Sequence, residues 1–394
     1  MTVDPDSISY ELGCLSKLIS FNTVNGNDEA HVSAADFLKK RLEELGCIVE
    51  MVDPYRDGKT DTPKPNVIGY MDFGKSETVS INCHYDIVPP GDGWDTNPFS
   101  MEIKEEKAYG RGANDDKGGI AITLGVLKKL KESGTSKYNI QVIFPCDEEV
   151  GGMLGTGYVL EKIGTDNLSM AIVLDSRKRA ILGSSGTVRG TITVHGIQAH
   201  SGQEWAGKNA ITEGIALLGE MNIYKKIRKN HTSALDLPEP TLPEGTKCFG
   251  RFNITVVNSG SAYNTIPGKL EAKFDMRLIP EETVDDAVHE LEEFFESAIK
   301  ITGVSGELRI DSSAPGYAVD QDNAYIRKFM KTAGFEKAYA TSGSNDGRYY
   351  HERGVPTMVT GMQIARTHHK PNENISFDEI VETERMLTLF LSEA

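Results

Sequence analysis

The stretch between residues 81 and 152 carries three polar clusters whose residue types suit hydrolysis assisted by a metal ion. They are His-Tyr-Asp at 84–86, the glycine-rich segment Gly-Arg-Gly-Ala-Asn-Asp-Asp-Lys-Gly-Gly at 110–119, and Asp-Glu-Glu at 147–149. Imidazole nitrogens and carboxylate oxygens bind zinc, and a further carboxylate can take the proton of an attacking water. We therefore expect an active site here.

The acidic cluster favours a bound cation. Asp147, Glu148 and Glu149 follow an apolar run with strand character and precede two glycines, which places three carboxylates at one strand end. A solvated acidic turn would look similar, but like charges so close repel each other unless a cation is bound. Asp86 is expected to hold the His84 imidazole in the tautomer whose other nitrogen faces the metal.

Two later clusters supply further candidate ligands. Asp175 stands at the end of a strand predicted at 171–174, and His368 and His369 are adjacent near the end of the chain. Either imidazole could ligate, and a solvated loop is the alternative. Each cluster alone is weak evidence for a metal site, whereas the occurrence of all of them in the order His, Asp, Glu-Glu, Asp, His is far more specific evidence. The glycine-rich segment lacks the spacing of a phosphate loop or a dinucleotide fingerprint, which argues against phosphate binding.

Composition excludes several classes of function. The chain has 394 residues, 39% hydrophobic and 25% charged, which predicts a globular protein of two domains. A formal net charge of −16 argues against nucleic acid or an anionic membrane as a partner. Five cysteines without a C-x-x-C spacing predict free thiols. Without a signal-peptide pattern or a long apolar run, a cytoplasmic location is expected.

The elements that must position these residues follow an α/β pattern. Strand, polar loop and helix alternate, which predicts a sheet with its site at the strand ends. Hydrophobic periodicity predicts helices at 7–19, 29–45 and 117–130 and strands at 47–52, 66–71, 78–83, 139–144 and 171–174.

A different pattern begins at Gly186. The order β-α-β-β-α-β predicts an inserted ferredoxin-like α+β domain, with strands at 187–195, 251–257, 270–277 and 306–310 and helices at 209–218 and 281–299. The polar, proline-bearing segment 222–248 is expected to be an exposed loop. Helices at 323–333 and 377–391 and strands at 339–341 and 355–359 then return to the first domain, so the predicted domains are 1–182 with 312–394, and 183–311.

These motifs together resemble the zinc amidohydrolase and peptidase family that includes succinyl-diaminopimelate desuccinylase, acetylornithine deacetylase, aminoacylase and glutamate carboxypeptidase. The resemblance covers nearly the whole chain. It implies a zinc-peptidase-like catalytic domain, with a mixed sheet flanked by helices, and an inserted lid through which two chains form a homodimer.

The resemblance also implies a ligand set for two zinc ions, which cobalt or manganese could replace. His84 and Asp175 would bind one ion, and Glu149 and His369 the other. Asp115 would bridge both, and the peptide bond that follows it would be cis.

The remaining roles implied by the resemblance concern chemistry and substrate. Glu148 would be the general base for a zinc-bridged hydroxide, and His200, in the lid, would hydrogen-bond the oxyanion in the partner's site. The carboxylate of the substrate would be held by residues of the lid and of the catalytic domain, namely Asn264, Arg277, Arg348 and Ser344.

The expected reaction is removal of an N-acyl group from an amino acid with a free carboxylate. A carboxypeptidase or dipeptidase acting on short peptides is the alternative within the family, and an inactive amino-acid-binding homologue is the alternative from another class. The sequence departs from the family at Ser201-Gly202, where many relatives have proline, and at Asp175-Ser176, where the deacylases have Glu-Pro. The substrate therefore stays open.

Overall fold

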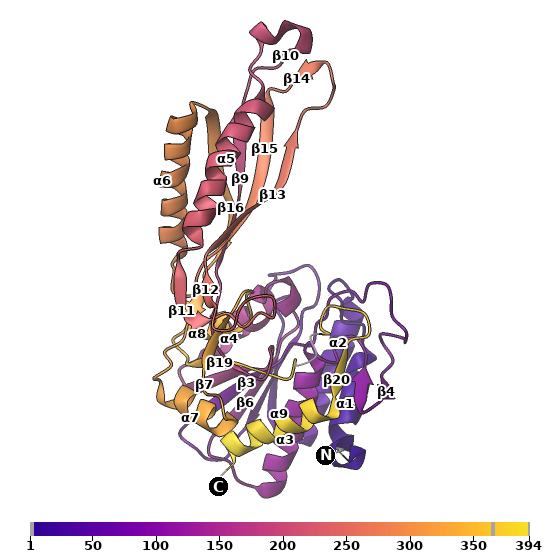
Figure 1. The fold of residues 1–394 in the computed structure, drawn as a ribbon. Coiled ribbons are helices and arrows are strands. Elements are labelled where there is room, and N and C mark those ends of the chain that lie inside the picture. Colours follow the sequence, from indigo (N-terminus) through magenta and orange to yellow (C-terminus); the bar gives the residue numbers. More distant parts are fainter. Residues whose placement is uncertain (1–3, 364–366, 393–394) are drawn as a thin grey trace. The chain divides into compact units, whose positions relative to one another are not determined.

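The computed structural model describes residues 4–363 and 367–392, and it divides the chain into two compact units. The first unit comprises Met1–Leu182, Val319–Ala338 and Asn345–Ala394. The second comprises Gly183–Ala318 and Tyr339–Ser344. Figure 1 shows the elements of both units along the chain.

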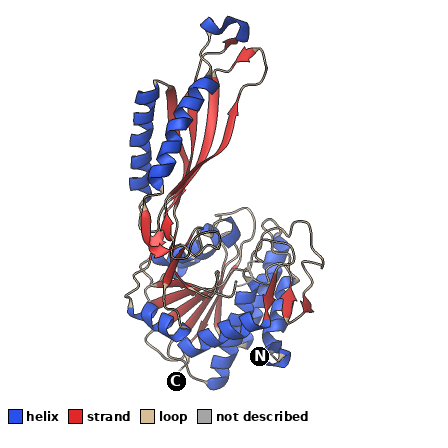
Figure 2. Ribbon diagram, viewed as in Figure 1, coloured by secondary structure: helices blue, strands red, loops and turns tan. Residues whose placement is uncertain are grey.

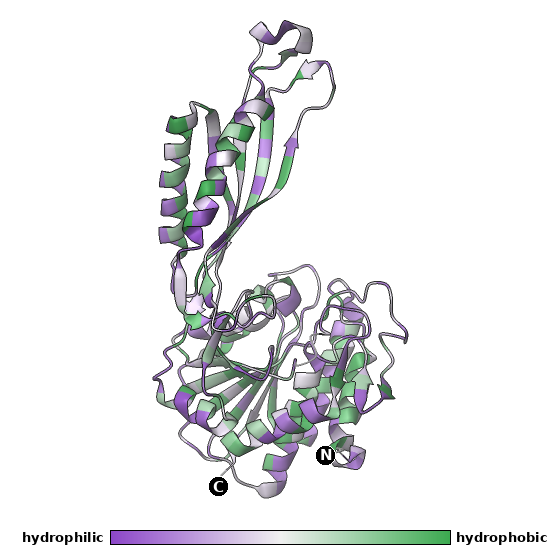
Figure 3. Ribbon diagram, viewed as in Figure 1, coloured by the Kyte–Doolittle hydropathy of each residue, from purple (hydrophilic) through white to green (hydrophobic). Residues whose placement is uncertain are grey.

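The first unit is built on a mixed sheet. Strand β3 pairs in parallel with β6 and β7, and β19 is parallel to β7, whereas β1–β2, β2–β6 and β19–β8 are antiparallel. The strand order is β1 (Ile48–Val52), β2 (Asn66–Met71), β6 (Asn139–Phe144), β3 (Thr78–Asn82), β7 (Leu168–Val173), β19 (Thr357–Val359) and β8 (Ala180–Ser184). Figure 3 shows these strands largely in the hydrophobic colour. The α/β class with a mixed sheet is confirmed.

Helices cover both faces of this sheet, as the central strand β3 demonstrates. All five of its residues are buried, although successive side chains point to opposite faces. On one face Ser80 Oγ lies 3.1 Å from the hydroxyl of Tyr350 in α8 (Gly347–His351). On the other, Sγ of Cys83, the residue directly after β3, lies 3.4 Å from Thr123 Oγ1 in α3 (Lys117–Ser133). Strands covered on both sides are typical of sheets that contain parallel pairs.

Two of the other helices of the first unit pack directly against α3. Helix α1 contacts α3, α3 contacts α9, and α9 contacts α7. The bounds of the other helices of the first unit are α1 (Ser9–Ile19), α2 (Asp28–Glu44), α4 (Tyr158–Ile163), α7 (Ala324–Ala333) and α9 (Phe377–Leu391). Ser376 and Glu379 form a capping box at the start of α9, which explains why this helix begins where the sequence predicts it. A small antiparallel sheet joins β4 (Glu102–Lys104), β5 (Lys107–Tyr109) and β20 (Asn374–Ser376).

The second unit has the predicted ferredoxin-like order. Its antiparallel sheet runs β13 (Arg251–Ser259), β15 (Lys269–Arg277), β9 (Thr187–His195) and β16 (Ser305–Ala314). Helices α5 (Ala210–Arg228) and α6 (Val284–Thr302) lie along one side of these strands, as Figure 2 shows. Ile192, Phe274 and Leu291 belong to the core between them. Shorter elements are β10 (Ala199–His200), β11 (Thr232–Asp236), β12 (Lys247–Phe249), β14 (Thr265–Ile266), β17 (Tyr317–Ala318) and β18 (Ala338–Thr341).

The prediction of an exposed loop at 222–248 is wrong. Helix α5 continues to Arg228, and the segment also forms β11 and most of β12. Tyr224 and Arg228 are fully buried, and two nitrogens of the Arg228 guanidinium each donate to Glu282 at 2.6 Å. Because the partner of Arg228 lies 54 residues further on, the polar composition of the segment concealed its burial. Across residues 4–363 and 367–392, no helix combines the length and apolarity that crossing a bilayer requires.

Candidate metal centre

The ends of three neighbouring strands deliver most of the candidate ligands. Strands β6 and β7 both lie parallel to β3, so all three end at the same edge of the sheet. His84 follows β3, residues 147–149 follow β6, and Asp175 follows β7. The mixed sheet therefore gathers residues that are far apart in the sequence.

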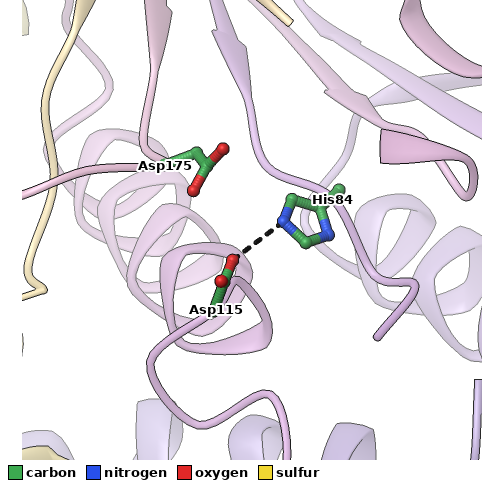
Figure 4. Close-up of side chains that lie close together, drawn as sticks. All are labelled: His84, Asp115 and Asp175. Atoms are coloured by element: carbon green, nitrogen blue, oxygen red, sulfur yellow. Dashed lines mark hydrogen bonds and ion pairs between the residues drawn. The ribbon is translucent and has the colours of Figure 1, made fainter. Parts of the chain in front are cut away.

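The first ligand cluster consists of His84, Asp115 and Asp175, one ligand atom of each lying within 4.8 Å of the others. His84 Nε2 is 3.0 Å from Asp115 Oδ1, and Figure 4 shows the three side chains turned toward one another. The Nδ1 atom of His84 lies 3.0 Å from the backbone oxygen of Asp86, to which a protonated Nδ1 can donate. That bond leaves Nε2 unprotonated in the neutral ring, as a metal ligand requires.

The second cluster shares Asp115 with the first. Its other members are Glu149 and His369, again with ligand atoms within 4.8 Å of one another. His369 Nε2 lies 3.1 Å from Glu149 Oε2 and 3.3 Å from Asp115 Oδ2. Its side chain is 51% exposed and its backbone adopts a left-handed φ of 59°, which a residue other than glycine rarely does. The two oxygens of Asp115 thus face different clusters.

The electrostatics of the site fit a pair of divalent cations. Burial, and then the neighbouring carboxylates, raise the pKa values of Asp175 and Glu148 well above the usual range. Burial also acts to raise the pKa of Asp115, but hydrogen bonds with His369 and His84 bring it below its usual value. Buried carboxylates and imidazoles are the donor set that zinc prefers, and cations would relieve their mutual repulsion.

Asp86 has a wider role than the predicted support of His84. Its Oδ1 is 3.4 Å from His84 Nδ1, and its carboxylate accepts the backbone N–H groups of Glu148 at 3.2 Å and Glu149 at 3.0 Å. Asp86 therefore fixes the imidazole through its backbone oxygen, where a carboxylate bond was expected, and fixes the turn that presents the acidic pair through its carboxylate.

The glycine-rich segment brings Asp115 close to the start of α3. The Asp115–Asp116 peptide bond is cis, which confirms the expectation. A Cβ atom on Gly118 would lie 2.3 Å from the backbone oxygen of Ala113, and one on Gly119 would lie 2.3 Å from Asp116 Oδ1. At position 118 the clash is with backbone, so only glycine lets the loop pack against its own helix there, whereas at 119 the Asp116 side chain would have to move.

The predicted substrate-binding residues are divided between the two units. Arg348, in the first unit, donates to the backbone oxygen of Gly151 and, at 2.7 Å, to the hydroxyl of Tyr349. The other three lie in the second unit: Ser344, which is exposed, Asn264 before β14, and Arg277 at the end of β15. His200, predicted to hydrogen-bond the oxyanion, lies in β10 of the same unit. Arg277 Nε donates to Asp275 at 2.7 Å, and His200 Nδ1 accepts from Gly202 at 3.1 Å.

Sequence reasoning missed three side chains around the site. Gln363 Nε2 donates to Asp175 Oδ1 at 3.1 Å. The buried Asp346 accepts from Thr156 Oγ1 at 2.6 Å, and burial raises its pKa to about 6. The carboxylate of Glu373 accepts the backbone N–H of Asp115 at 3.0 Å. The contacts of all three residues are distant in sequence, and only Asp346 had a local signal, the Asn-Asp-Gly run at 345–347.

Comparisons with known proteins identify the class to which this fold and site belong. A profile of peptidase family M20/M25/M40 matches residues 80–393, so the chain belongs to this family. It is a metallohydrolase that acts on amide or peptide bonds. The resemblance seen in the motifs is thereby confirmed.

Individual relatives differ in their activities. The chain is 27% identical over 383 residues to a succinyl-diaminopimelate desuccinylase of a Sulfurovum species, covering 93% of this chain and 94% of the relative. It is 29% identical over 356 residues to carboxypeptidase G2 of a Pseudomonas species, covering 87% and 79%. The fold is similar to that of aminopeptidase PepT from Bacillus cereus, with a TM-score of 0.77, 18% identity and 97% of both chains covered.

Proposed function

We propose that the chain holds two zinc ions and hydrolyses the amide bond of an N-acyl amino acid. The observation that carries the proposal is the sharing of Asp115 by two ligand clusters. His84 and Asp175 would hold one ion, and Glu149 and His369 the other. If bound there, zinc would supply a Lewis acid for the scissile carbonyl and for the attacking water. Cobalt or manganese could occupy the same donor set.

Glu148 is the proposed general base. Among the described residues, both ligand clusters leave it out, although it is adjacent to Glu149. Its pKa is raised by burial, which suits a group that takes a proton from water near neutral pH, and the Asp86 carboxylate fixes its backbone. Glu148 would then pass that proton to the leaving amine nitrogen, while Asp86 keeps both His84 and the acidic turn in place.

The substrate is proposed to carry a free carboxylate. Arg277 and Arg348 are candidates to hold it, because a guanidinium fork binds a carboxylate in bidentate fashion. Asn264 and Ser344 are candidates because an amide NH₂ and a hydroxyl can donate to a carboxylate oxygen. The relative named as a desuccinylase supports N-deacylation. The relative named as a carboxypeptidase supports the alternative, cleavage of short peptides.

The general-base role is tested by Glu148→Gln, with the helix-surface Glu161→Gln as a matched control. The first variant should keep two equivalents of metal by elemental analysis and lose nearly all turnover, whereas the control should keep both. Hydrolysis at the wild-type rate in Glu148→Gln would refute the mechanism. N-succinyl amino acids, N-acetyl amino acids and dipeptides, assayed in parallel, would identify the substrate class. Binding without turnover of any of them would favour an amino-acid-binding homologue.

We also propose that the second unit forms a homodimer. Exposed isoleucines lie four or eight residues apart along α5, at Ile211, Ile215, Ile223 and Ile227, and Val257 is half exposed on the edge strand β13. An apolar stripe beside a free strand edge is a surface that a second copy can cover.

The dimer gives His200 its proposed role in the partner's site. Mixing His200→Ala subunits with Glu148→Gln subunits should restore part of the activity, because one of the two sites in a heterodimer would then be intact. Heterodimers without activity would indicate that His200 acts within its own chain or has no role. A cytoplasmic location is proposed as well, in keeping with five buried cysteines that are all free thiols.

A further inference from the structure

The carboxylate of Glu373 gathers four donors in the interior of the first unit. Its side chain is fully buried. Oε1 accepts the backbone N–H groups of Asn114 at 2.8 Å and Asp115 at 3.0 Å. Oε2 accepts the N–H of Gly112 at 3.1 Å and Arg111 Nη1 at 2.5 Å. The loop that leads to Asp115, the ligand shared by both clusters, is thus hydrogen-bonded to the side chain of Glu373.

Glu373 also belongs to the segment that carries the other distant ligand. His369 lies four residues earlier. The two ends of this segment are joined by Thr367 Oγ1, which donates to the backbone oxygen of Asn374 at 3.1 Å and accepts from its backbone N–H at 3.2 Å. The backbone oxygen of Glu373 accepts the N–H of Gly110 at 3.0 Å. Contacts from residue 373 therefore join the two loops that supply Asp115 and His369.

The arrangement requires a carboxylate at this position. Three N–H groups and a guanidinium all donate, so both oxygens must accept, and an amide would turn an NH₂ group toward two of the donors. Arg111 balances the buried charge. It is 1% exposed, donates to the backbone oxygen of Pro90 at 3.0 Å, and lies 5.3 Å from the ring of Trp94.

We infer that Glu373 is a positioning residue that holds Asp115 and His369 in a metal-ready arrangement before any metal binds. This inference rests on the proposed dinuclear centre. The competing explanation is that Glu373 and Arg111 form an ordinary buried ion pair that supports the fold alone. The two explanations differ in what happens to metal affinity when stability is lowered by the same amount.

The test compares Glu373→Gln with Glu384→Gln. Glu384 is a matched control because it is 2% exposed and pairs with a lysine of α3 at 2.5 Å, but belongs to neither ligand loop. Zinc affinity is measured by competition with a chromogenic chelator, and folding by circular dichroism. Glu373→Gln should weaken zinc binding by about 10–100-fold, as partners that orient ligands typically do, while the control leaves it unchanged. Equal zinc affinity in folded Glu373→Gln and wild type would overturn the inference.

Two further measurements keep the test decisive if Glu373→Gln does not fold. In Arg111→Gln the three amide bonds to Glu373 remain, so zinc affinity should stay within about 10-fold of wild type even where Tm falls. A larger loss of zinc affinity would favour the ion-pair explanation. In metal-free wild-type protein, the amide protons of Gly112, Asn114 and Asp115 should resist hydrogen exchange. Rapid exchange there would overturn the inference by itself. Failure of the proposed function has a different signature, namely wild-type protein that binds no zinc.

Discussion

Adding one methyl group at Gly118 should disturb the metal centre by a predictable amount. The Cβ of Gly118→Ala would lie 2.3 Å from the backbone oxygen of Ala113. Favourable contacts between heavy atoms lie near 3.5 Å, so helix and loop must separate by about 1 Å. Neither can move freely, since Gly118 lies in the first turn of α3 and the loop is bonded to Glu373. Asp115, two residues beyond Ala113, must move with them.

The expected losses follow from that displacement. Overpacking of this kind typically costs ~1–3 kcal/mol of unfolding free energy. A ligand displaced by about 1 Å can lower the catalytic rate by roughly 100-fold. Gly13→Ala is the matched control, because Gly13 lies inside α1 with no atom within 4 Å of an added Cβ. It should stabilise the protein by up to ~1 kcal/mol, since alanine favours a helix over glycine.

The assay combines thermal unfolding, zinc content and kcat/KM for the substrate found in the panel. Gly118→Ala should lower all three, and Gly13→Ala none of them. A Gly118→Ala protein with wild-type kcat/KM and zinc content would show that the loop accommodates the methyl group. Close packing at Gly118 would then not be what positions Asp115.

Three further predictions concern stability and assembly. Burial raises the pKa of Glu11 to about 7, above its value of about 4.5 in the unfolded chain. Its contribution to stability is therefore present below pH 4.5 and is lost as the pH rises through 7, where the buried carboxyl group must ionise. The gain in Tm of Glu11→Gln over wild type should for this reason be larger at pH 8 than at pH 5. Arg228→Leu leaves Glu282 without its buried partner and should lower unfolding free energy by ~3–5 kcal/mol in urea titrations, and a change near zero would contradict the importance of this pair. Ile215→Glu should shift the light-scattering mass from dimer to monomer, whereas Ile48→Glu, equally exposed on β1, should not; two dimeric variants would contradict the proposed interface.

Much of the fold could be predicted because its signals are local. Strands β2, β6 and β9 and helix α9 have the predicted bounds, since each shows clear periodicity between turn or capping residues. The candidate metal ligands at strand ends could also be predicted, because each polar residue closely follows an apolar run.

The features that sequence reasoning missed depend on distant contacts. Arg228 looks like a solvent-exposed residue of a basic run until Glu282 is seen to pair with it. The small sheet of β4, β5 and β20 joins segments more than 260 residues apart, which no local pattern reveals. Glu373 similarly reads as one more acidic residue in a polar loop. Its role exists only because the chain returns to residues 111–115.

The division of the chain also sets an order in time. Most of the second unit is one continuous segment, Gly183–Ala318, whereas the first unit takes in residues up to the end of the chain. Domains fold as units while the ribosome adds residues at about 5–20 per second. The inserted unit can therefore fold first, and the candidate centre lacks His369 and Glu373 until the last part of the chain emerges. A nascent chain interrupted before that point would carry folded structure without a complete hydrolytic centre.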